Sequence, residues 1–457
     1  MKLGSRVQEL VDLVDRDDVM SAADEMDLSA MQLAAADERF QDHRKRIPIL
    51  EQRASDMGVD KISSVDDILP LLFAHTTYKS YPASFLTNGQ WDRLLQWFET
   101  VSAEPMDDVD LSGVDNVDSW IAAVTKAGHY VYASSGTSGK NSFGNQSQDD
   151  IDTIADLLTR LWGWPKPVPR TNSLPLFIVA PASGPSRFNY AGAALAKYVA
   201  RPGAVYTLTD EALQMGEVNK TMRIQQAMAA GRATPSEVAE FERSLKGKAD
   251  TMAQGHERLA RALQEHKDEP FILWGGVPQT YALVERCHEL GFEGGKFLPE
   301  AVYLAGGGTK GLSLPQGFEA EIAAFFSSAR SYNGYGMSET VTHSPRCEAG
   351  RYHVPPWLIL MVVDETGENR RYQPSGPVTG RAAYMDSVWD GHWGGTITGD
   401  WITADYGRCA CGRPGPTIAD DIQRARDVIG LEDDKVSCAG AVDAYVRGAL
   451  RTSDDPQ

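Results

Sequence analysis

Short apolar runs alternate with segments of helical periodicity through the middle of the chain. Bounded by turn residues, the apolar runs predict strands at 130–133, 176–180, 204–208, 271–274, 301–304 and 358–363. Two intervening segments, 151–161 and 235–266, repeat apolar residues on one face and predict helices. Strands that alternate with helices predict mainly parallel sheets flanked by helices, which is the α/β fold class.

The first 75 residues have a different pattern, because apolar residues such as Leu10 and Val14 recur at helical spacing among acidic residues. We therefore expect a helical N-terminal region at 1–110 that packs on a core at 111–428. Within that core, 365–400 is rich in glycine and predicts a small β subdomain made of shorter strands.

Composition narrows the class of protein. The 457 residues are 42% hydrophobic and 23% charged, which is typical of a soluble globular protein with two or three domains. The net charge of −19 disfavours nucleic-acid and anionic-membrane partners, because both surfaces would repel the chain. No apolar stretch approaches the roughly 18 residues of a membrane span, and five cysteines do not predict a secreted disulfide framework. We expect a cytoplasmic protein.

A loop of hydroxyl and glycine residues follows the first predicted strand and ends in a lysine, with the sequence Ser134-Ser135-Gly136-Thr137-Ser138-Gly139-Lys140. Its backbone N–H groups, rotatable hydroxyls and single cation suit a polyphosphate. It is not a Walker loop, since Ser134 and Asn141 stand where that motif needs Gly and Ser or Thr. Considered alone, the segment is as readily interpreted as a flexible surface loop.

Two later motifs have matching chemistry. Asn333-Gly334-Tyr335-Gly336-Met337-Ser338-Glu339 combines an aromatic ring, a hydroxyl and a carboxylate, a set that suits a purine, a phosphate and Mg²⁺. Thr398-Gly399-Asp400 offers a carboxylate able to accept hydrogen bonds from two ribose hydroxyls. Each motif is weak alone, and the prediction depends on their order.

In that order the motifs resemble those of the adenylate-forming superfamily of acyl-CoA ligases and adenylation domains. Three more segments are similar to its branch of phenylacetate–CoA ligases and acyl-protein synthetases of bacterial luminescence: Gly306-Gly307-Gly308-Thr309-Lys310, Cys409-Ala410-Cys411-Gly412-Arg413 and Asp433-Asp434-Lys435. The resemblance implies that 111–428 is the large domain of an adenylate-forming enzyme. It also implies that ATP and a carboxylic acid react to give an acyl-adenylate and pyrophosphate, before transfer to a thiol or amine acceptor.

The resemblance also implies roles for single residues. Lys140, Ser338 and Glu339 would be catalytic: Lys140 and its loop hold the β- and γ-phosphates, Ser338 orients the α-phosphate and Glu339 binds Mg²⁺. The adenosine would be bound by Gly307, Gly308, Asn333, Tyr335, Gly336 and Asp400. Trp274, Phe188 and Tyr190 could line an aromatic acid site and could equally belong to the core.

Four residues predict a metal site. Cys347, His353, Cys409 and Cys411 supply the four ligands of a closed tetrahedral zinc site, although Cys-x-Cys is tighter than the usual spacing. Some phenylacetate–CoA ligase relatives carry a similar set, which implies a structural zinc. His343 competes for the histidine position, and reduced surface thiols with unrelated histidines are the alternative interpretation.

The end of the chain departs from the family. Residues 429–457 are expected to hold a hinge and a truncated C-terminal lobe, so the lysine of the full lobe has no counterpart here. Leu431 stands where the hinge carries an arginine, and Arg424 or Arg426 would supply that cation instead. Three alternatives therefore stay open: an acyl-protein synthetase that uses Cys438 as acyl carrier, a carrier protein or partner enzyme that completes the reaction, and a non-catalytic nucleotide-binding scaffold. A small buried residue is the other interpretation of Cys438.

Overall fold

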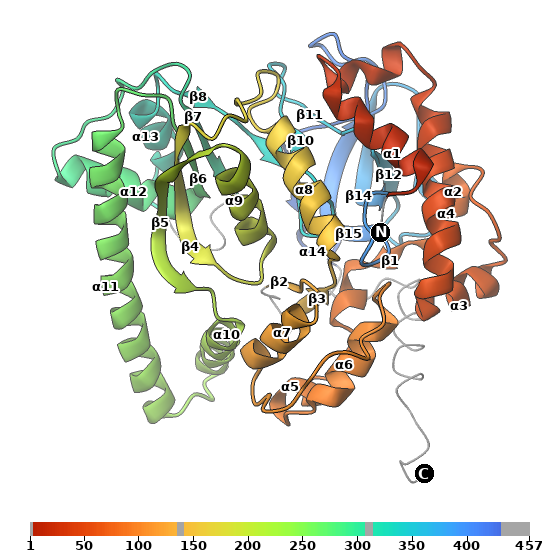
Figure 1. Ribbon diagram of the computed structural model, residues 1–457, viewed down its shortest axis with the longest axis horizontal. Helices are drawn as coiled ribbons and strands as arrows, with labels where there is room; N and C mark the ends of the chain where they lie inside the picture. The colour runs from red at the N-terminus through yellow and green to blue at the C-terminus, as the bar shows by residue number, and fades with distance from the viewer. Residues whose placement is uncertain (1–2, 135–140, 307–313, 431–457) are drawn as a thin grey trace. The chain divides into compact units, whose positions relative to one another are not determined.

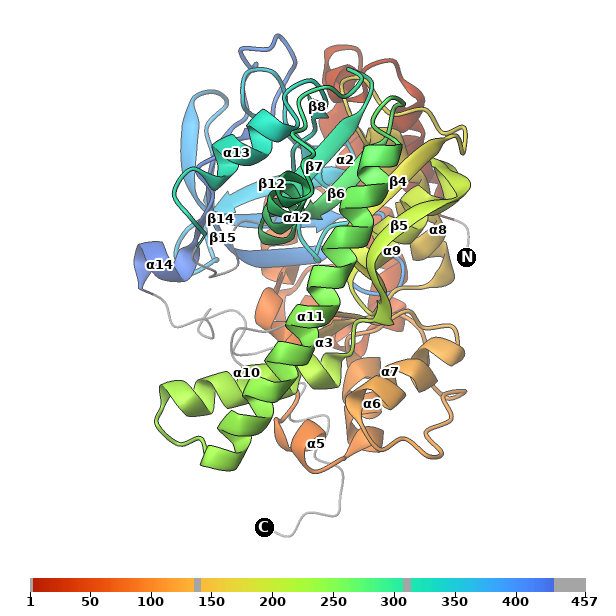
Figure 2. The same ribbon diagram turned by 90° about the vertical axis from the view of Figure 1, so that its left-hand side faces the viewer.

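A computed structural model describes residues 3–134, 141–306 and 314–430, and the chain divides into two compact units (Figures 1 and 2). Unit 1 is built from the described residues up to Leu157 and from Tyr335 onward, and unit 2 is Leu158–Gly334. The boundaries predicted near residues 110 and 428 stay predictions. Within the described ranges, no helix is both long and apolar enough to cross a membrane.

Unit 2 contains a five-stranded sheet in which all neighbouring strands are parallel. The order is β5-β4-β6-β7-β8, and the strands are β4 (Leu174–Ser183), β5 (Ala200–Ala212), β6 (Ile272–Gly276), β7 (Val302–Gly306) and β8 (Arg330–Ser331). Every apolar run predicted in this region overlaps one of these strands, with starts that differ by at most one residue for those that extend beyond the strand. The α/β prediction is therefore confirmed for unit 2.

Helix α9 (Arg187–Tyr198) covers one face of this sheet, and α11 (Pro235–Glu265), α12 (Val277–Glu289) and α13 (Phe318–Phe325) cover the other. Helix α10 (Met215–Ala229) packs on α11. Figure 2 shows α11 crossing in front of the strands. On β4, Phe177 packs in one buried cluster with Leu263 of α11, whereas Ile178 packs in another with Leu195 of α9. Burial of alternate side chains on opposite faces explains why these strands are apolar throughout.

Unit 1 begins with helices, as predicted for the first 75 residues. These are α1 (Ser5–Val11), η1 (Asp12–Asp15), η2 (Val19–Asp24), α2 (Leu28–Arg46), α3 (Pro48–Met57), α4 (Val65–Ile68), η3 (Leu69–Leu71), η4 (His75–Lys79), α5 (Ser84–Thr87), α6 (Trp91–Thr100) and α7 (Val117–Lys126). A two-residue strand, β1 (Phe73–Ala74), interrupts them. The predicted helix at 151–161 is α8 (Gln148–Leu161), which crosses the boundary between the units.

The main sheet of unit 1 has eight strands in the order β11-β16-β15-β14-β12-β13, with β1 and β17 also paired to β15. Its strands are β11 (Tyr352–His353), β12 (Leu358–Val363), β13 (Arg370–Arg371), β14 (Pro377–Asp386), β15 (Gly395–Asp405), β16 (Thr417–Ile418) and β17 (Gln423–Arg424). Two short pairs accompany it, β2 (Tyr132–Ser134) with β3 (Ser142–Gly144) and β9 (Gly334–Tyr335) with β10 (Ser344–Pro345). A short helix, α14 (Ala425–Ile429), follows β17.

The region expected to form a small β subdomain is instead the centre of this sheet. Strands β14 and β15 have 10 and 11 residues, so the expectation of shorter strands was wrong. Its glycines indicated turns in the sequence, but in the structure several allow close packing. A methyl group on Gly394, for example, would lie 2.0 Å from the carbonyl oxygen of Asp386.

Strand β15 organises unit 1 because its two edges have different partners. One edge pairs with β14, and the other is shared by β1 at Thr396, β17 at Asp400 and β16 at Ala404. The β14 register also shifts: Arg381 pairs with Trp401 and Ala383 with Ile397. Residues 398–400 of β15 therefore oppose one residue of β14, so this motif lies in a bulge.

A buried polar network ties the helices to the turn between β14 and β15. One carboxylate oxygen of Asp150 accepts hydrogen bonds from the amides of Ser147 (2.9 Å) and Gly391 (2.8 Å), and the other accepts one from Asp390 (2.8 Å). The Asp390 carboxylate in turn pairs with Arg39 (3.2 Å) and Arg46 (3.0 Å) of α2. Burial raises the pKa of Asp150 to about 6, although the three N–H donors favour the ionised form and oppose this shift.

Asp150→Asn should destabilise unit 1, because an amide cannot accept hydrogen bonds at both of its ends. At least one buried N–H loses its acceptor, which costs about 1–3 kcal/mol. Urea unfolding at pH 7 measures the difference. Asp152→Asn on the exposed side of the same helix is the matched control, and equal unfolding midpoints for the two variants would contradict the importance of this network.

Candidate functional site

Three residues of the predicted nucleotide site meet in unit 1. The Tyr335 hydroxyl donates to Oδ2 of Asp400 at 2.7 Å, and Nη1 of Arg424 donates to Oδ1 at 2.8 Å. Strand pairing enforces this arrangement, because Asp400 of β15 lies directly opposite Arg424 of β17. Each carboxylate oxygen has two lone pairs, so both can still accept a further hydrogen bond.

Burial affects both the Tyr335 phenol and the Asp400 carboxylate that it contacts. Burial, followed by the charges of Tyr384 and Asp400, raises the pKa of Tyr335 well above its usual range, so its phenol stays a proton donor. The Asp400 side chain is 13% exposed and that of Arg424 is 64% exposed, which places the carboxylate at a buried edge. Of the two predicted cations, Arg424 contacts Asp400, whereas Arg426 pairs with the neighbouring Asp427 at 3.4 Å.

The turn that carries Ser338 and Glu339 is anchored to the end of β14. Nε1 of Trp389 donates to the Glu339 carbonyl oxygen at 3.0 Å, and Oδ2 of Asp386 accepts from the Val341 amide at 2.7 Å. Burial raises the pKa of Tyr78 well above its usual range, and the charge of Glu339 adds to the shift. The Glu339 carboxylate is thus close enough to Tyr78 to act on it electrostatically, and both Ser338 and Glu339 are half-buried.

Gly336 is required by packing in the same turn. A methyl group on its α-carbon would lie 2.8 Å from Cβ of His343, closer than side-chain carbons approach. His343 therefore packs against this motif. Asn333 belongs to unit 2, where its Nδ2 donates to Oγ of Ser331 at 3.2 Å.

Other predicted site residues lie outside the described residues. These are Ser135, Gly136, Thr137, Ser138, Gly139, Lys140, Gly307, Gly308 and Cys438. Ser134 ends β2, where its backbone pairs with Ser142 of β3. The phosphate-binding roles of the loop stay predictions.

The aromatic residues predicted either to line an acid site or to belong to the core lie in unit 2. The rings of Phe188 and Trp274 have centroids 4.0 Å apart, and both pack against the buried cluster on the α9 face of the sheet. Tyr190 is half-buried. This packing explains the positions of the Phe188 and Trp274 rings without a bound acid.

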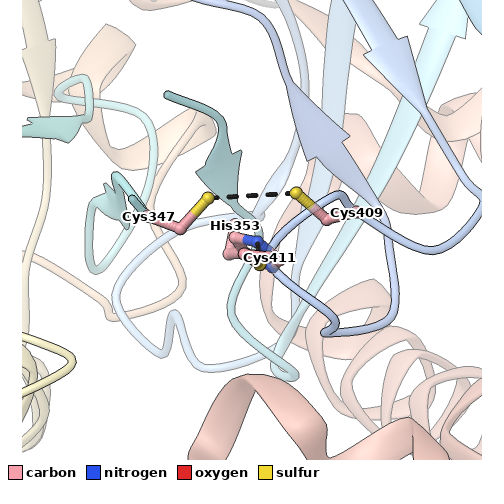
Figure 3. Close-up of side chains that lie close together, drawn as sticks. All are labelled: Cys347, His353, Cys409 and Cys411. Carbon is pink, nitrogen blue, oxygen red and sulfur yellow. Dashed lines mark hydrogen bonds between the residues drawn. The ribbon is translucent and has the colours of Figure 1, made fainter. Parts of the chain in front are cut away.

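The four predicted zinc ligands gather in unit 1, with all four ligand atoms within 4.8 Å of one another (Figure 3). Sγ of Cys347 and Sγ of Cys409 are 3.9 Å apart, and Sγ of Cys411 is 3.3 Å from Nε2 of His353. With Zn–S bonds of about 2.3 Å and Zn–N bonds of about 2.0 Å, tetrahedral geometry requires about 3.8 Å and 3.5 Å for these pairs. The donor set therefore fits a structural zinc ion, and the histidine is His353.

Two turns of the same design present the cysteines. Each has the sequence Cys-x-x-Gly-Arg, at 347–351 and 409–413. In both turns, the amide of the first cysteine donates to the carbonyl oxygen of the arginine at 2.9 Å. The glycine amide donates to the carbonyl oxygen of the same cysteine, also at 2.9 Å. Gly350 (φ +76°) and Gly412 (φ +91°) take the left-handed backbone conformation that such a tight turn needs. This repeat is present in the sequence, and it is a second signal for the site besides the spacing of the ligands.

The surroundings of the cluster favour the metal-binding form of His353 and Cys411 and disfavour that of Cys409. Burial, followed by the Arg413 charge, lowers the pKa of His353 to about 4, so the imidazole is neutral at pH 7. Burial raises the pKa of the Cys409 thiol to about 11, whereas at Cys411 hydrogen bonds from Arg413 outweigh burial and lower the pKa. Arg413 also donates to Oδ2 of Asp18 at 2.6 Å, which connects the second turn to the N-terminal helices.

Asp42, His43 and Asp390 form a second group whose potential ligand atoms lie close together. Here the neighbours are unfavourable to a cation. Both Arg39 and Arg46 pair with the Asp390 carboxylate. The cysteine cluster is the better metal site among the described residues.

Sequence comparison adds no family assignment, because no protein-family model and no curated protein matches the chain.

The purified protein should contain about one zinc ion per chain, and Cys409→Ser should lose it, because a hydroxyl is a far poorer zinc ligand than a thiolate. Elemental analysis by mass spectrometry, together with the thermal midpoint before and after chelation, measures both effects. Cys287→Ala is the control, since this thiol is buried in the core of unit 2 and is not one of the four clustered ligands. Equal zinc content in wild type and Cys409→Ser would contradict the site.

Proposed function

We propose that this chain is an ATP-dependent acid-activating enzyme of the adenylate-forming superfamily, in the branch of phenylacetate–CoA ligases and acyl-protein synthetases. The observation that carries the proposal is the hydrogen bonding of Tyr335 and Arg424 to the two oxygens of Asp400. Tyr335 and Asp400 come from two motifs 65 positions apart, and Arg424 is one of the two cations expected to replace the hinge arginine. Their convergence on one carboxylate is what a nucleoside site built from these motifs requires.

The proposed reaction begins when an oxygen of the substrate carboxylate attacks the α-phosphorus of ATP. A new C–O–P linkage forms as the bond to the β-phosphate oxygen breaks, so acyl-AMP and pyrophosphate are the products. No proton has to be removed from an ionised acid, and catalysis consists of alignment and charge neutralisation. A thiol or amine acceptor then takes the acyl group and releases AMP.

Each residue contributes binding or charge neutralisation. Asp400 accepts hydrogen bonds from the ribose hydroxyls, and Tyr335, whose hydroxyl is fixed by Asp400, presents its ring to the adenine. Ser338 donates to the α-phosphate, and Glu339 holds the Mg²⁺ that neutralises phosphate charge. Lys140 with its loop binds the departing pyrophosphate, and zinc at the cysteine cluster has a structural role only, because four protein ligands fill its coordination.

A cytoplasmic location fits this activity, because ATP and acceptors such as CoA or a carrier protein are found there. The acceptor is a small thiol, an amine, a carrier protein or a partner enzyme. Trp274 and Phe188 pack on the core, so they do not favour an aromatic acid over a fatty or amino acid.

ATP–pyrophosphate exchange tests the proposal without knowledge of the acceptor. We expect Mg²⁺-dependent exchange with one of three pools of aryl, fatty or amino acids. Exchange should fall about 10²–10³-fold in Lys140→Ala and Glu339→Ala, the usual loss for a group that stabilises transition-state charge. The controls are Lys61→Ala and Glu293→Ala, which remove exposed charges of the same sign.

ATP binding without exchange in any pool would contradict catalysis and support a nucleotide-binding scaffold. Exchange that appears only when a partner protein is added would show that the partner supplies groups needed for adenylation. Equal exchange in Lys140→Ala and Lys61→Ala would contradict the role assigned to the loop.

A further inference from the structure

One edge of β15 is open beside the Asp400 carboxylate. This edge pairs with β1 at Thr396 and Ile397, and with β17 at Asp400 and Trp401. Between these two pairings, no strand within the described ranges pairs with Thr398 or Gly399 on this side. The opening coincides with the bulge against β14, a place where the strand cannot continue a regular ladder.

The N-terminal region places His75 at this opening. Because β1 runs parallel to β15 with Phe73 opposite Thr396 and Ala74 opposite Ile397, the next residue is level with the start of the motif. A methyl group on Gly399 would lie 3.6 Å and 3.7 Å from Cε1 and Nε2 of His75, and 3.9 Å from Nη1 of Arg424. The imidazole and the guanidinium therefore line the space that a side chain at position 399 would occupy, next to Asp400.

The helix that begins with His75 is held firmly in place. In η4, the Tyr78 hydroxyl donates to the carbonyl oxygen of Trp393 at 2.9 Å, and just beyond it the Tyr81 hydroxyl donates to that of Asn141 at 2.9 Å. Tyr78 is buried and lies close enough to Glu339 to feel its charge. The segment is therefore bonded to Asn141, which follows the hydroxyl loop, and lies near Glu339. These interactions hold the element that carries His75.

We propose that His75 is a ribose-contacting residue of the nucleotide site, so that the N-terminal region takes part in ATP recognition. This inference depends on the proposed function, because it assigns a second partner to the ribose that Asp400 would bind. Sequence patterns did not identify His75, because it belongs to none of the motifs found in the sequence.

The hydrogen-bonding inventory supports this role. An ionised carboxylate only accepts, so Asp400 can take the hydrogens of the ribose hydroxyls but cannot donate to their oxygens. Those oxygens need a donor, and the Arg424 guanidinium lies against the carboxylate while the His75 imidazole lies beside the neighbouring Gly399. Together the three side chains match hydroxyl groups that must both donate and accept.

Binding of ATP and of its ribose-deoxy analogues to His75→Ala tests the proposal. We expect the Kd for ATP to rise about tenfold, the effect of one hydrogen bond. For 2′-deoxy-ATP or 3′-deoxy-ATP, whichever lacks the contacted hydroxyl, the same variant should bind within about threefold of wild type. His75→Gln, which keeps an N–H donor, should recover part of the ATP affinity, and His288→Ala, a half-buried histidine of unit 2, should bind like wild type.

An unchanged Kd for ATP in His75→Ala, or an equal loss for ATP and both deoxy analogues, would overturn the proposal. A thermal midpoint equal to that of wild type shows that the variant is folded. If His75→Ala has a lower thermal midpoint, the ATP affinity of His75→Gln tests the proposal instead. Wild-type protein that binds no ATP would overturn the proposed function itself. Wild-type binding that His75→Ala leaves intact would overturn only the role of His75.

Discussion

The backbone hydrogen bonds along one edge of β15 are the constraint on which unit 1 depends. Three short strands share that edge in succession: β1 from the N-terminal region, followed by β17 and β16, which lie close together after β15 in the sequence. Their side chains therefore meet wherever the strands do: His75 follows β1, Arg424 belongs to β17, and Asp400 lies between them on β15. The eight-stranded sheet thus does more than bury apolar surface, because its pairing register decides which polar groups become neighbours.

The two sheets differed in how far the sequence could predict them, and burial explains the difference. In unit 2, strands such as β4 are buried on both faces, so continuous apolar runs marked them without tertiary information. At β15 the buried residues Thr398 and Asp400 are polar, and hydrogen bonds rather than apolar contacts compensate their burial. Strands of two residues, such as β1, leave no local pattern, because only their distant partner makes them strands.

The site shows the same division between local and long-range information. Tyr335 and Asp400 could be named from the sequence because each belongs to a short motif, and the cysteine set because its residue types are those of a zinc site. The choice of Arg424 over Arg426, and of His353 over His343, required knowledge of strand pairing and packing. The position of His75 beside Gly399 was the least predictable from the sequence, since it depends on the parallel register of β1 with β15, more than 300 residues later.

The twin turns also have a consequence for the unfolded chain. Cys347 and Cys409 are 62 positions apart, and the segment between them contains β12, β14 and β15. A metal ion held by both turns closes this segment into a loop, and the chain-entropy relation for a cross-link of that length gives about 4 kcal/mol of lost unfolded-state freedom. An ion at the periphery of the sheet would thus favour the ordered form of the strands that carry Asp400, without touching that residue.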